Sequence, residues 1–597
     1  MGDRPQRSAS PGWTRLAMAV WVAAVTASIV HTVLGRWVCD DIYITFRYCD
    51  NLLAGLGPVY NAGERSEGYT HFLWFLLLTL GRALGIEAAT LGRWVGIPFY
   101  VGSLLVLGRL SARLFPGRGG WAGVPVAMLG WAAHADARLF GSGGLETAAF
   151  TFFLLLGFEF TFASQRPRRG ELSGWAFAVA CLLRPDGLLY SVLAVAFLAW
   201  RPERRREIRE FVPTWLVLVA PLFVFRMLYY GWLFPNPYYA KSGGHANWAQ
   251  GILYARMYFQ SYFVLAAGLV AAVPLAFAWR RRAQSSVTAA SAGSDPFPAL
   301  LFAWVAAATT LLYVVRVGGD FMFGRFFLPT TPFLLLLIEW MVHRLPRLGL
   351  RVVAAAAVVG LVVTGGLVKQ SWLSGKRNVW GIVDEPQFYP DYRLRGVLET
   401  ARRLRDCLAG TDAVLMVQGG QASLAYYARF PVAIERYGLT DETIAHTPIQ
   451  ARGRPGHEKY APAEYIYERR VNLRINWQPV RSVPIYTLWG LGDASGEIIV
   501  YDRELMEHMK QCHGARFLDF PLWLEQTYLP SVPTELEFRL RRDWNHFQLF
   551  YFMHNPDPER LRERLRAALA ERGITGLPDV VSPSEPFEDL GAPTGGP

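Results

Sequence analysis

The sequence predicts a polytopic α-helical membrane domain followed by a soluble C-terminal domain of the α/β or α+β type. Of the 597 residues, 52% are hydrophobic and only 18% are charged, and the mean hydropathy is +0.19. Apolar runs of bilayer-spanning length recur up to about residue 370 and then stop. We therefore expect about 11 transmembrane helices within residues 1–370 and a folded extracytoplasmic domain in residues 371–572.

The first apolar run, residues 16–34, follows Arg4, Arg7 and Arg15. This pattern is typical of a signal peptide, but the run is long enough to span and no A-x-A cleavage site follows it. We expect an uncleaved signal anchor, which leaves residues 35–70 outside.

Basic loops set the orientation of the later runs. If every run crossed, the Arg109–Arg118 cluster would face outward, against the positive-inside rule. The cluster faces inward instead if residues 71–108 contain one full span plus a juxtamembrane or re-entrant helix that does not cross the membrane. The clusters that then lie inside are Arg109–Arg118, Arg166–Arg169, Arg201–Arg206, Arg280–Arg282 and His343–Arg351. The excess of Arg and Lys in these inner loops explains the net charge of +12. No nucleic-acid partner is therefore expected.

After Ser371 the pattern becomes that of a soluble domain. The predicted strands are Ala413–Val417, Val432–Glu435, Ile485–Trp489 and Glu497–Tyr501, and the predicted helices are Tyr392–Leu408, Arg503–His513 and Pro558–Arg572. Residues 573–597, rich in Pro, Gly and acidic residues, are expected to be disordered, and Ser285–Asp295 to be a cytoplasmic linker. Five cysteines without CxxC spacing leave one Cys39–Cys49 or Cys407–Cys512 bridge open.

The polar segments left outside share one face of the membrane. They are DDIYITFRYCDN with its following loop, HADARLFGSGGLET, RPDG, YYGWLFPNPYYAKSGGH and RVGGDFMFGR. Polar outer loops are ordinary in a membrane protein, but ionisable groups near membrane depth are costly and indicate a functional site. Five such loops with both carboxylates and cations favour a site on this face.

Asp40 and Asp41 directly follow the first span. Burial and mutual repulsion would raise the pKa of at least one of them, which suits a general base. The alternative is an N-cap of the helix 42–53, and both roles are compatible. Because Asp40 follows the span directly, we assign the cap to Asp40 and favour Asp41 as the base.

The next external segments add further candidate groups. Glu67, Tyr69 and His71 stand in the loop before the second apolar run, where a carboxylate beside an aromatic ring suits a sugar site. His134 and Glu146 flank GSGG and, with Glu67 and His71, would offer ligands to a divalent cation, although their spacing matches no standard metal motif. A divalent cation is therefore one option, and no cofactor is predicted with certainty.

The run DDIYITFRYCDNLLAGLGPVYNAGERSEGYTHFLW resembles the first external loop of the GT-C class of polytopic glycosyltransferases. It is most similar to the branch of terminal β-(1→2) arabinofuranosyltransferases. GSGGLET, LLRPDG, YYGWLFPNPYYAK and VGGDFMFGRFFLP continue the resemblance through residues 16–370, and YGLTDE and RPGHEKY add scattered likeness in the C-terminal domain.

The resemblance implies a GT-C-like fold and a polyprenyl-phosphate sugar donor, with arabinofuranose as the sugar in characterised relatives. It implies a catalytic aspartate at Asp40 or Asp41, a second acidic residue at Glu67, and a glycan or glycoconjugate acceptor of the cell envelope. The protein would then lie in the bacterial plasma membrane, in contact with lipid, with its active site extracytoplasmic.

A lipid phosphate needs cations near the outer leaflet. The candidates are Arg47, Arg184, Lys241 and Arg325. Arg184 in RPDG and Arg325 in GGDFMFGR also have structural alternatives, as ion pairs with Asp186 and Asp320. The expected substrate-binding residues are Asp186, Glu146, Asp320, Tyr69 and His71.

The leading hypothesis is therefore a membrane glycosyltransferase. A transporter or flippase of a lipid-linked sugar is the alternative, although no internal repeat is visible and the charges gather at one interface rather than at the midplane. A glycan-binding scaffold is a third reading, for which eleven spans are excessive.

Overall fold

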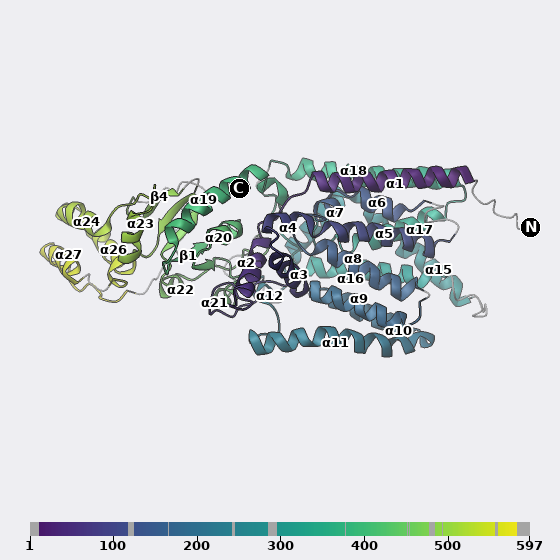
Figure 1. Cartoon of the computed structure of the whole chain (residues 1–597), viewed down its shortest axis with the longest axis horizontal. Helices are drawn as coiled ribbons and strands as arrows, with labels where there is room; N and C mark the ends of the chain where they lie inside the picture. The colour runs from purple at the N-terminus through teal and green to yellow at the C-terminus, as the bar shows by residue number, and fades with distance from the viewer. Residues whose placement is uncertain are drawn as a thin grey trace, which may run out of the picture.

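The computed structural model describes residues 11–116, 124–164, 166–241, 245–284, 295–375, 378–418, 420–449, 452, 454–476, 484–491, 494–555 and 559–581. Two parts lie next to each other along the long axis of the molecule (Figure 1). We call residues 11–373 the helical bundle and residues 378–581 the C-terminal part. The linker predicted at 285–294 and the tail beyond residue 581 lie outside the described residues.

The bundle contains eighteen α-helices among its described residues. They are α1 (Pro11–Leu34), α2 (Ile42–Leu53), α3 (Phe72–Ala83), α4 (Ala88–Trp94), α5 (Ile97–Leu114), α6 (Val126–Ala133), α7 (Ala135–Leu139), α8 (Thr147–Phe162), α9 (Arg169–Leu183), α10 (Gly187–Trp200), α11 (Arg205–Tyr229), α12 (Asn236–Ala240), α13 (Trp248–Ser261), α14 (Ala266–Val270), α15 (Ala272–Gln284), α16 (Phe297–Val317), α17 (Thr331–His343) and α18 (Leu348–Leu373).

Within the described chain, five helical segments are long and apolar enough to cross a membrane. They are Ala88–Leu114, Pro202–Tyr229, Phe263–Arg280, Phe297–Val317 and Leu348–Leu373. Five shorter apolar helices accompany them: Met18–Leu34, Phe72–Ala83, Thr147–Phe162, Gly187–Trp200 and Thr331–His343. The chain is therefore a multi-pass membrane protein.

The region 71–108, where the parity argument required a helix that does not cross, contains a short helix followed by a candidate span. Helix α3 has 12 residues, which is roughly 18 Å at 1.5 Å per residue, well below a hydrocarbon core of about 30 Å. In Figure 1, α2 and α3 lie at the end of the bundle that faces the C-terminal part.

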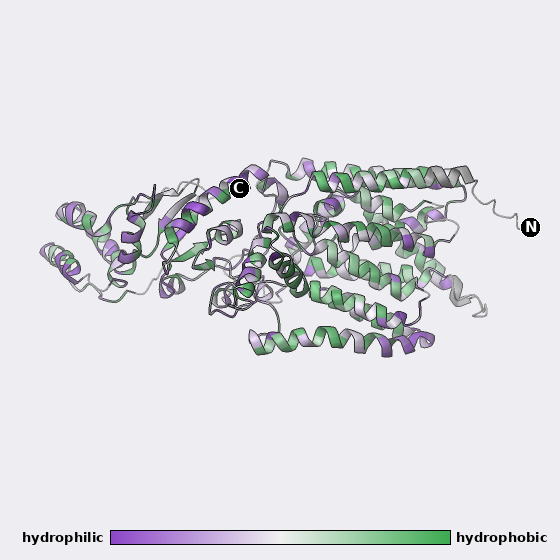
Figure 2. Ribbon diagram, viewed as in Figure 1, coloured by the Kyte–Doolittle hydropathy of each residue, from purple (hydrophilic) through white to green (hydrophobic). Residues whose placement is uncertain are grey.

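Basic residues of separate helices pair with glutamates at the opposite end of the bundle. Arg109 lies 2.6 Å from Glu159 at the end of α8, and Arg169 lies 2.7 Å from Glu207 at the start of α11. Figure 2 shows hydrophilic residues at this end, away from the C-terminal part. The basic loops and the C-terminal part are thus at opposite ends of the bundle.

The C-terminal part is built around a mixed five-stranded sheet. Its strands are β1 (Val414–Val417), β2 (Val432–Glu435), β3 (Leu473–Asn476), β4 (Thr487–Leu491) and β5 (Ala494–Ile498), in the order β2-β1-β3-β5-β4. Strand β1 is parallel to β2 and β3, whereas β5 is antiparallel to β3 and β4.

The helices around the sheet are α19 (Asp391–Leu408), α20 (Ala422–Ala428), α21 (Glu442–Ala445), α22 (Ala463–Glu468), α23 (Arg503–Lys510), α24 (Phe520–Trp523), α25 (Leu529–Ser531), α26 (Glu537–Phe547) and α27 (Glu559–Glu571). The predictions of β2 and α19 are confirmed nearly to the residue. The strand predicted at 497–501 was wrong in its bounds, since β5 begins at Ala494 and ends at Ile498.

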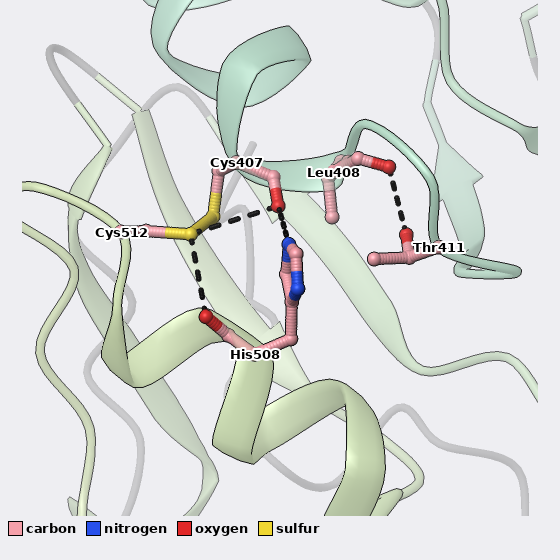
Figure 3. Close-up of a disulfide and its surroundings, with 5 residues drawn as sticks. All are labelled: Cys407, Leu408, Thr411, His508 and Cys512. Atoms are coloured by element: carbon pink, nitrogen blue, oxygen red, sulfur yellow. Dashed lines mark hydrogen bonds between the residues drawn. A yellow bond between two sulfur atoms is a disulfide. The ribbon is translucent and has the colours of Figure 1, made fainter.

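A disulfide joins Cys407 at the end of α19 to Cys512 after α23 (Figure 3). The imidazole of His508 lies beside it, with Nε2 2.9 Å from the carbonyl oxygen of Cys407. Cys39 and Cys49 are free and buried. Of the two bridges left open by the sequence, the one within the C-terminal part is formed.

A candidate active site between the bundle and the C-terminal part

A cavity of about 590 Å³ opens between the bundle and the C-terminal part. The bundle contributes Asp40, Asp41, Lys241 and Phe321 to its walls. The C-terminal part contributes Glu385, Tyr389, Glu435, Tyr437, Arg454 and His457. Ionisable groups from both parts therefore face one enclosed space.

The strand-like segment before α2 positions the two aspartates. Cys39 donates its backbone N–H to Gly143 O at 2.9 Å, and Gly143 donates to Trp37 O at 3.1 Å. Gly143 has φ of 89°, and a Cβ there would lie 2.9 Å from the Trp37 ring. The GSGG segment thus needs this glycine for close packing under the aspartates.

Asp40 is bound to the C-terminal part. Its carboxylate accepts hydrogen bonds from the backbone of Ala422 (2.8 Å) and Ser423 (2.9 Å) and from the Ser423 hydroxyl (2.5 Å), at the N-terminus of α20. Asp40 was expected to cap α2, and this was wrong. It satisfies the first turn of a helix some 380 residues away instead, because that N-terminus points at it.

Asp41 is different, although it is the next residue. It occupies the N-cap position of α2 without a side-chain cap bond, and within the described chain its carboxylate has no hydrogen bond or ion pair. Burial raises the pKa of Asp41, and the cations Lys241 and Arg325 oppose that shift. Asp41 therefore faces the cavity as an available acceptor of a proton or hydrogen bond.

Three cations lie near Asp41. Lys241 has no ion pair among the described residues, and its methylene chain packs on Gly456, where a Cβ would lie 3.3 Å from Cε. Arg325 is paired with Asp320 at 2.5 Å. Arg454 stacks over the Phe321 ring, 4.5 Å from its centroid. Of these three cations, Lys241 is thus the one most available to a ligand.

Arg184 forms a buried ion cluster with its neighbours. Its guanidinium contacts Asp186 through Nε (2.9 Å) and Nη2 (3.2 Å), and Glu146 through Nη1 (3.2 Å). His71 lies 3.5 Å from Glu146 and 3.0 Å from the Thr45 hydroxyl. This set, which we call the Arg184 cluster, contains four of the predicted site residues in one place.

The Arg184 cluster adjoins Arg325 through an aromatic ring, and none of Arg184, Arg325 and Phe326 lines the cavity. Phe326 lies against both guanidinium groups, with its centroid 5.1 Å from Arg184 and 5.5 Å from Arg325. The residues predicted to bind phosphate at 184 and 325 are therefore neighbours, and both already have carboxylate partners.

Glu67 and Tyr69 do not line the cavity. Glu67 is 3% exposed and pairs with Arg226 of α11 through both oxygens, at 2.8 and 3.0 Å. The hydroxyl of Tyr69 contacts that of Tyr230 at 3.0 Å. These residues bind the loop before α3 to the end of α11.

Arg47 is also occupied. It donates to the backbone carbonyls of Tyr60 (2.7 Å) and Phe430 (2.8 Å) and to Asn61 Oδ1 (3.1 Å). It is 8% exposed and does not line the cavity. Its contacts join α2 to the C-terminal part and leave no free edge for a phosphate.

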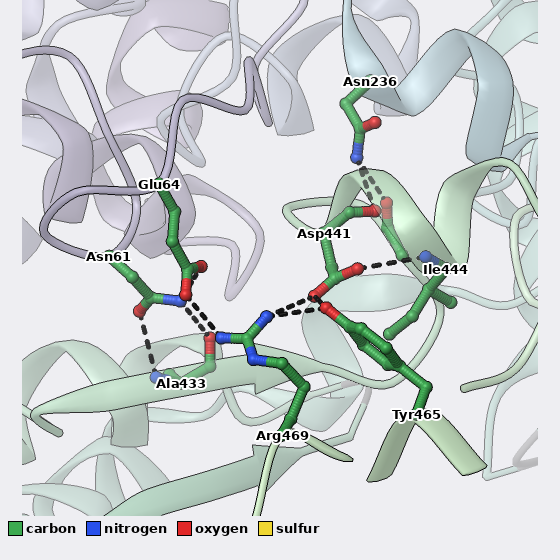
Figure 4. A network of polar contacts seen from close by, with 9 residues as sticks. Asn61, Glu64, Asn236, Ala433, Asp441, Ile444, Tyr465 and Arg469 are labelled. Carbon is green, nitrogen blue, oxygen red and sulfur yellow. Dashed lines mark hydrogen bonds and ion pairs between the residues drawn. The ribbon is translucent and has the colours of Figure 1, made fainter. Parts of the chain in front are cut away.

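A second polar network holds the two parts together beside the cavity (Figure 4). Arg469 pairs with Glu64 of the bundle and lies 3.5 Å from Asp441. Asn236, at the start of α12, donates to the carbonyls of Gly438 (2.7 Å) and Asp441 (3.1 Å). Together with the contacts of Asp40 and Arg47, this network joins the two parts at several separate points.

The possible divalent-cation site does not assemble in the described part of the chain, where no three His, Cys, Asp or Glu side chains are arranged to hold a metal. His134 Nε2 lies 3.1 Å from the Tyr258 hydroxyl, and Glu146 is engaged by Arg184 and His71. The four candidate ligands are therefore spread over three separate clusters.

Several cavity residues were missed from the sequence. Tyr437 belongs to YGLTDE, and Arg454 and His457 belong to RPGHEKY, so the scattered likeness of those segments was a usable signal. His457 packs edge-on against Tyr437, with 4.5 Å between the ring centroids. Burial together with Arg454 lowers the pKa of His457 to about 3. Glu385 stands in no recognisable motif.

No family model matches the chain. It is 33% identical over 317 residues to the terminal β-(1→2)-arabinofuranosyltransferase of Mycobacterium tuberculosis, covering 49% of this chain and 50% of that protein. The protein of the same name from Corynebacterium glutamicum is 27% identical over 417 residues, with coverage of 65% and 60%. The resemblance found in the sequence is confirmed, and the chain spans half to three fifths of the length of these relatives.

Among solved structures, ArnT from Cupriavidus metallidurans bound to undecaprenyl phosphate gives a TM-score of 0.47 at 15% identity, covering 71% of this chain and 86% of that one. The apo form gives 0.45 at 13% identity, with coverage of 72% and 87%.

Proposed function

We propose that this chain is a membrane glycosyltransferase that transfers a sugar, arabinofuranose in its named relatives, from a polyprenyl phosphate to a hydroxyl of a cell-envelope glycan. The observation that carries the proposal concerns Asp41 and Lys241, a carboxylate and a cation that have no ion pair among the described residues and line one cavity at the end of a membrane bundle. The similarity to two arabinofuranosyltransferases supports the choice of reaction.

In the proposed reaction, Asp41 takes the proton from the acceptor hydroxyl as its oxygen attacks the anomeric carbon of the donor. The bond between that carbon and the phosphate oxygen breaks, and polyprenyl phosphate leaves. Lys241 lies where it would stabilise the charge of the leaving phosphate. Arg325 and Arg184 are paired with carboxylates outside the cavity lining, so we propose Lys241 as the phosphate contact. Asp40 positions Asp41, and Glu67 is not among the residues that we propose as catalytic.

We place the cavity and the C-terminal part on the outer side of a bacterial plasma membrane. Two observations support this orientation. The C-terminal part carries a disulfide, which persists in oxidising compartments. The basic loops gather at the other end of the bundle, as expected of a cytoplasmic end.

The test is transfer by the purified full-length protein. We expect it to convert a polyprenyl-phosphate arabinofuranoside and an arabinofuranosyl oligosaccharide into an extended oligosaccharide and free polyprenyl phosphate. Product formation excludes the transporter and scaffold readings together. Failure with every polyprenyl-phosphate sugar supplied, by protein that is folded in the same detergent, would contradict the proposed function.

A further inference from the structure

Two buried glutamates line the cavity from the C-terminal part, and their carboxyl groups differ in hydrogen bonding. Glu435 accepts backbone hydrogen bonds at both oxygens, from Tyr437 (3.0 Å) and Leu439 (2.7 Å). Glu385 is 4% exposed, yet its carboxyl has no hydrogen bond or ion pair within the described residues. A carboxyl normally has a partner in the protein or in ordered water, so a carboxyl that has no protein partner and lines a cavity is available to a ligand hydroxyl.

From this contrast we propose that Glu385 binds a sugar hydroxyl in the active site, opposite Asp41. The inference rests on the proposed glycosyl transfer and adds a substrate-binding residue from outside the external loops of the bundle. Glu385 is a positioning residue in this proposal, and Asp41 remains the base.

The bundle holds the Glu385 segment firmly in place. Val383 pairs with the loop after α16, donating to Phe321 O at 2.8 Å and accepting from Phe323 N at 3.0 Å. Lys369 of α18 contacts Asp384 at 2.7 Å and Asp136 of α7 at 2.6 Å. Glu385 directly follows these two anchors. The position of Glu385 near Asp41 is therefore fixed by the loop after α16, by α18 and by α7. Rigid support of this kind is needed for a residue that binds substrate.

The charges around Glu385 indicate what kind of group it receives. The neighbours that influence it electrostatically are Asp41, Arg454, Asp40 and Asp320. Three of the four are acidic, so an anionic ligand group such as the donor phosphate is disfavoured there. Burial and these acids raise the pKa of Glu385 to about 8. A protonated carboxyl can donate a hydrogen bond to a hydroxyl oxygen and can also accept one from a hydroxyl group. Sugar hydroxyls are abundant in both substrates.

The experiment compares Glu385→Ala and Glu385→Gln with Glu399→Gln, a matched change on the exposed face of α19 that lies outside the cavity. Steady-state kinetics are measured with a polyprenyl-phosphate arabinofuranoside and an arabinofuranosyl disaccharide. Binding of the disaccharide alone is measured by calorimetry. We expect Glu385→Ala to raise one KM about 10-fold or more, as loss of one hydrogen-bonding partner does, and Glu385→Gln to recover part of the loss.

The two substrates separate the sources of the hydroxyl. A raised KM for the disaccharide with weaker calorimetric binding assigns the hydroxyl to the acceptor, whereas a raised KM for the lipid assigns it to the donor sugar. Kinetics and binding of both Glu385 variants within about twofold of Glu399→Gln would overturn the inference while wild-type transfer stands. Absence of transfer by the wild-type protein would overturn the proposed function itself, and this inference with it.

Discussion

Asp40 and Asp41 are adjacent in the sequence but have different surroundings, so their amide variants should fail in different ways. Asp41→Asn removes the proposed base and should lower turnover by about 10²–10⁴-fold with little change in Tm. Asp40→Asn disturbs the bonds to α20 and should lower stability by about 1 kcal/mol, with a smaller loss of rate. Initial rates and melting curves in detergent measure both. Equal kinetic losses in the two variants would contradict this division.

Glu385 should make stability depend on pH. Its pKa is raised to about 8 in the folded protein, whereas the unfolded chain ionises near 4.5. Between these values the folded state binds the extra proton, so stability falls as pH rises and the loss is complete above pH 8. The loss in free energy of unfolding from pH 5 to pH 8 is on the order of a few kcal/mol, and Glu385→Gln should flatten the accompanying fall in Tm. Parallel curves for the two proteins would show that Glu385 ionises normally.

Sequence patterns selected Asp40, Asp41 and Lys241, which line the cavity, and also Arg47, which does not. From local sequence alone, an arginine on an external helix cannot be distinguished from a phosphate-binding residue. Its partners are backbone carbonyls of Tyr60 and Phe430, and the second of these lies 383 positions away. Glu385 went unnoticed for the same reason, since its burial depends on pairing between residues 322 and 383.

At the scale of elements, the connection between α9 and α10 contributes Arg184 and Asp186 to the Arg184 cluster. Arg184 is 8% exposed and bound by Asp186 and Glu146. We therefore expect Arg184→Lys and Asp186→Asn to lower Tm by similar amounts. A lysine ammonium cannot contact Asp186 and Glu146 together as the guanidinium does, and Asn removes one of the two compensating charges. The donor KM should stay near its wild-type value in both. A raised donor KM in Arg184→Lys alone, with Tm kept, would assign Arg184 to the phosphate.

The disulfide should stabilise the C-terminal part substantially, because it closes a long stretch of chain. Cys407 and Cys512 are 105 positions apart, and such loops contribute roughly 2–5 kcal/mol. Cys512→Ser should therefore lower Tm clearly, as should treatment of the wild-type protein with a reductant. Cys181→Ser, which changes a free cysteine of α9, is the control and should change Tm much less. Equal effects of the two substitutions would show that the bridge adds little.

Elements with strong local patterns were predictable, and those defined by distant pairing were not. Helix α19 alternates apolar and charged residues at helical spacing, and β2 is a short β-branched run, so both were predicted nearly to the residue. Strand β3 was missed. It is four residues long, contains Arg474 and Asn476, and gains its partners from β1 and β5 on either side.

At the scale of the whole molecule, the ends of the bundle should face opposite sides of the membrane. Glu399 of α19 and Arg206 of α11 are exposed at the two ends. In a background whose free cysteines are replaced by alanine, Glu399→Cys should react with an impermeant maleimide on intact cells. Arg206→Cys should react only after permeabilisation. Labelling of position 206 from outside would reverse the proposed orientation.

The cavity takes its acidic groups from both the bundle and the C-terminal part, so the site exists only while the two are in contact. Asp40 at the N-terminus of α20, Arg47 and Asn236 hold them together around it. Tyr392, 69% exposed, stands at the rim. An antibody fragment that binds this rim and forces the parts slightly apart would separate Glu385 from Asp41. Inhibition of this protein therefore does not require a compound that resembles a sugar or a lipid.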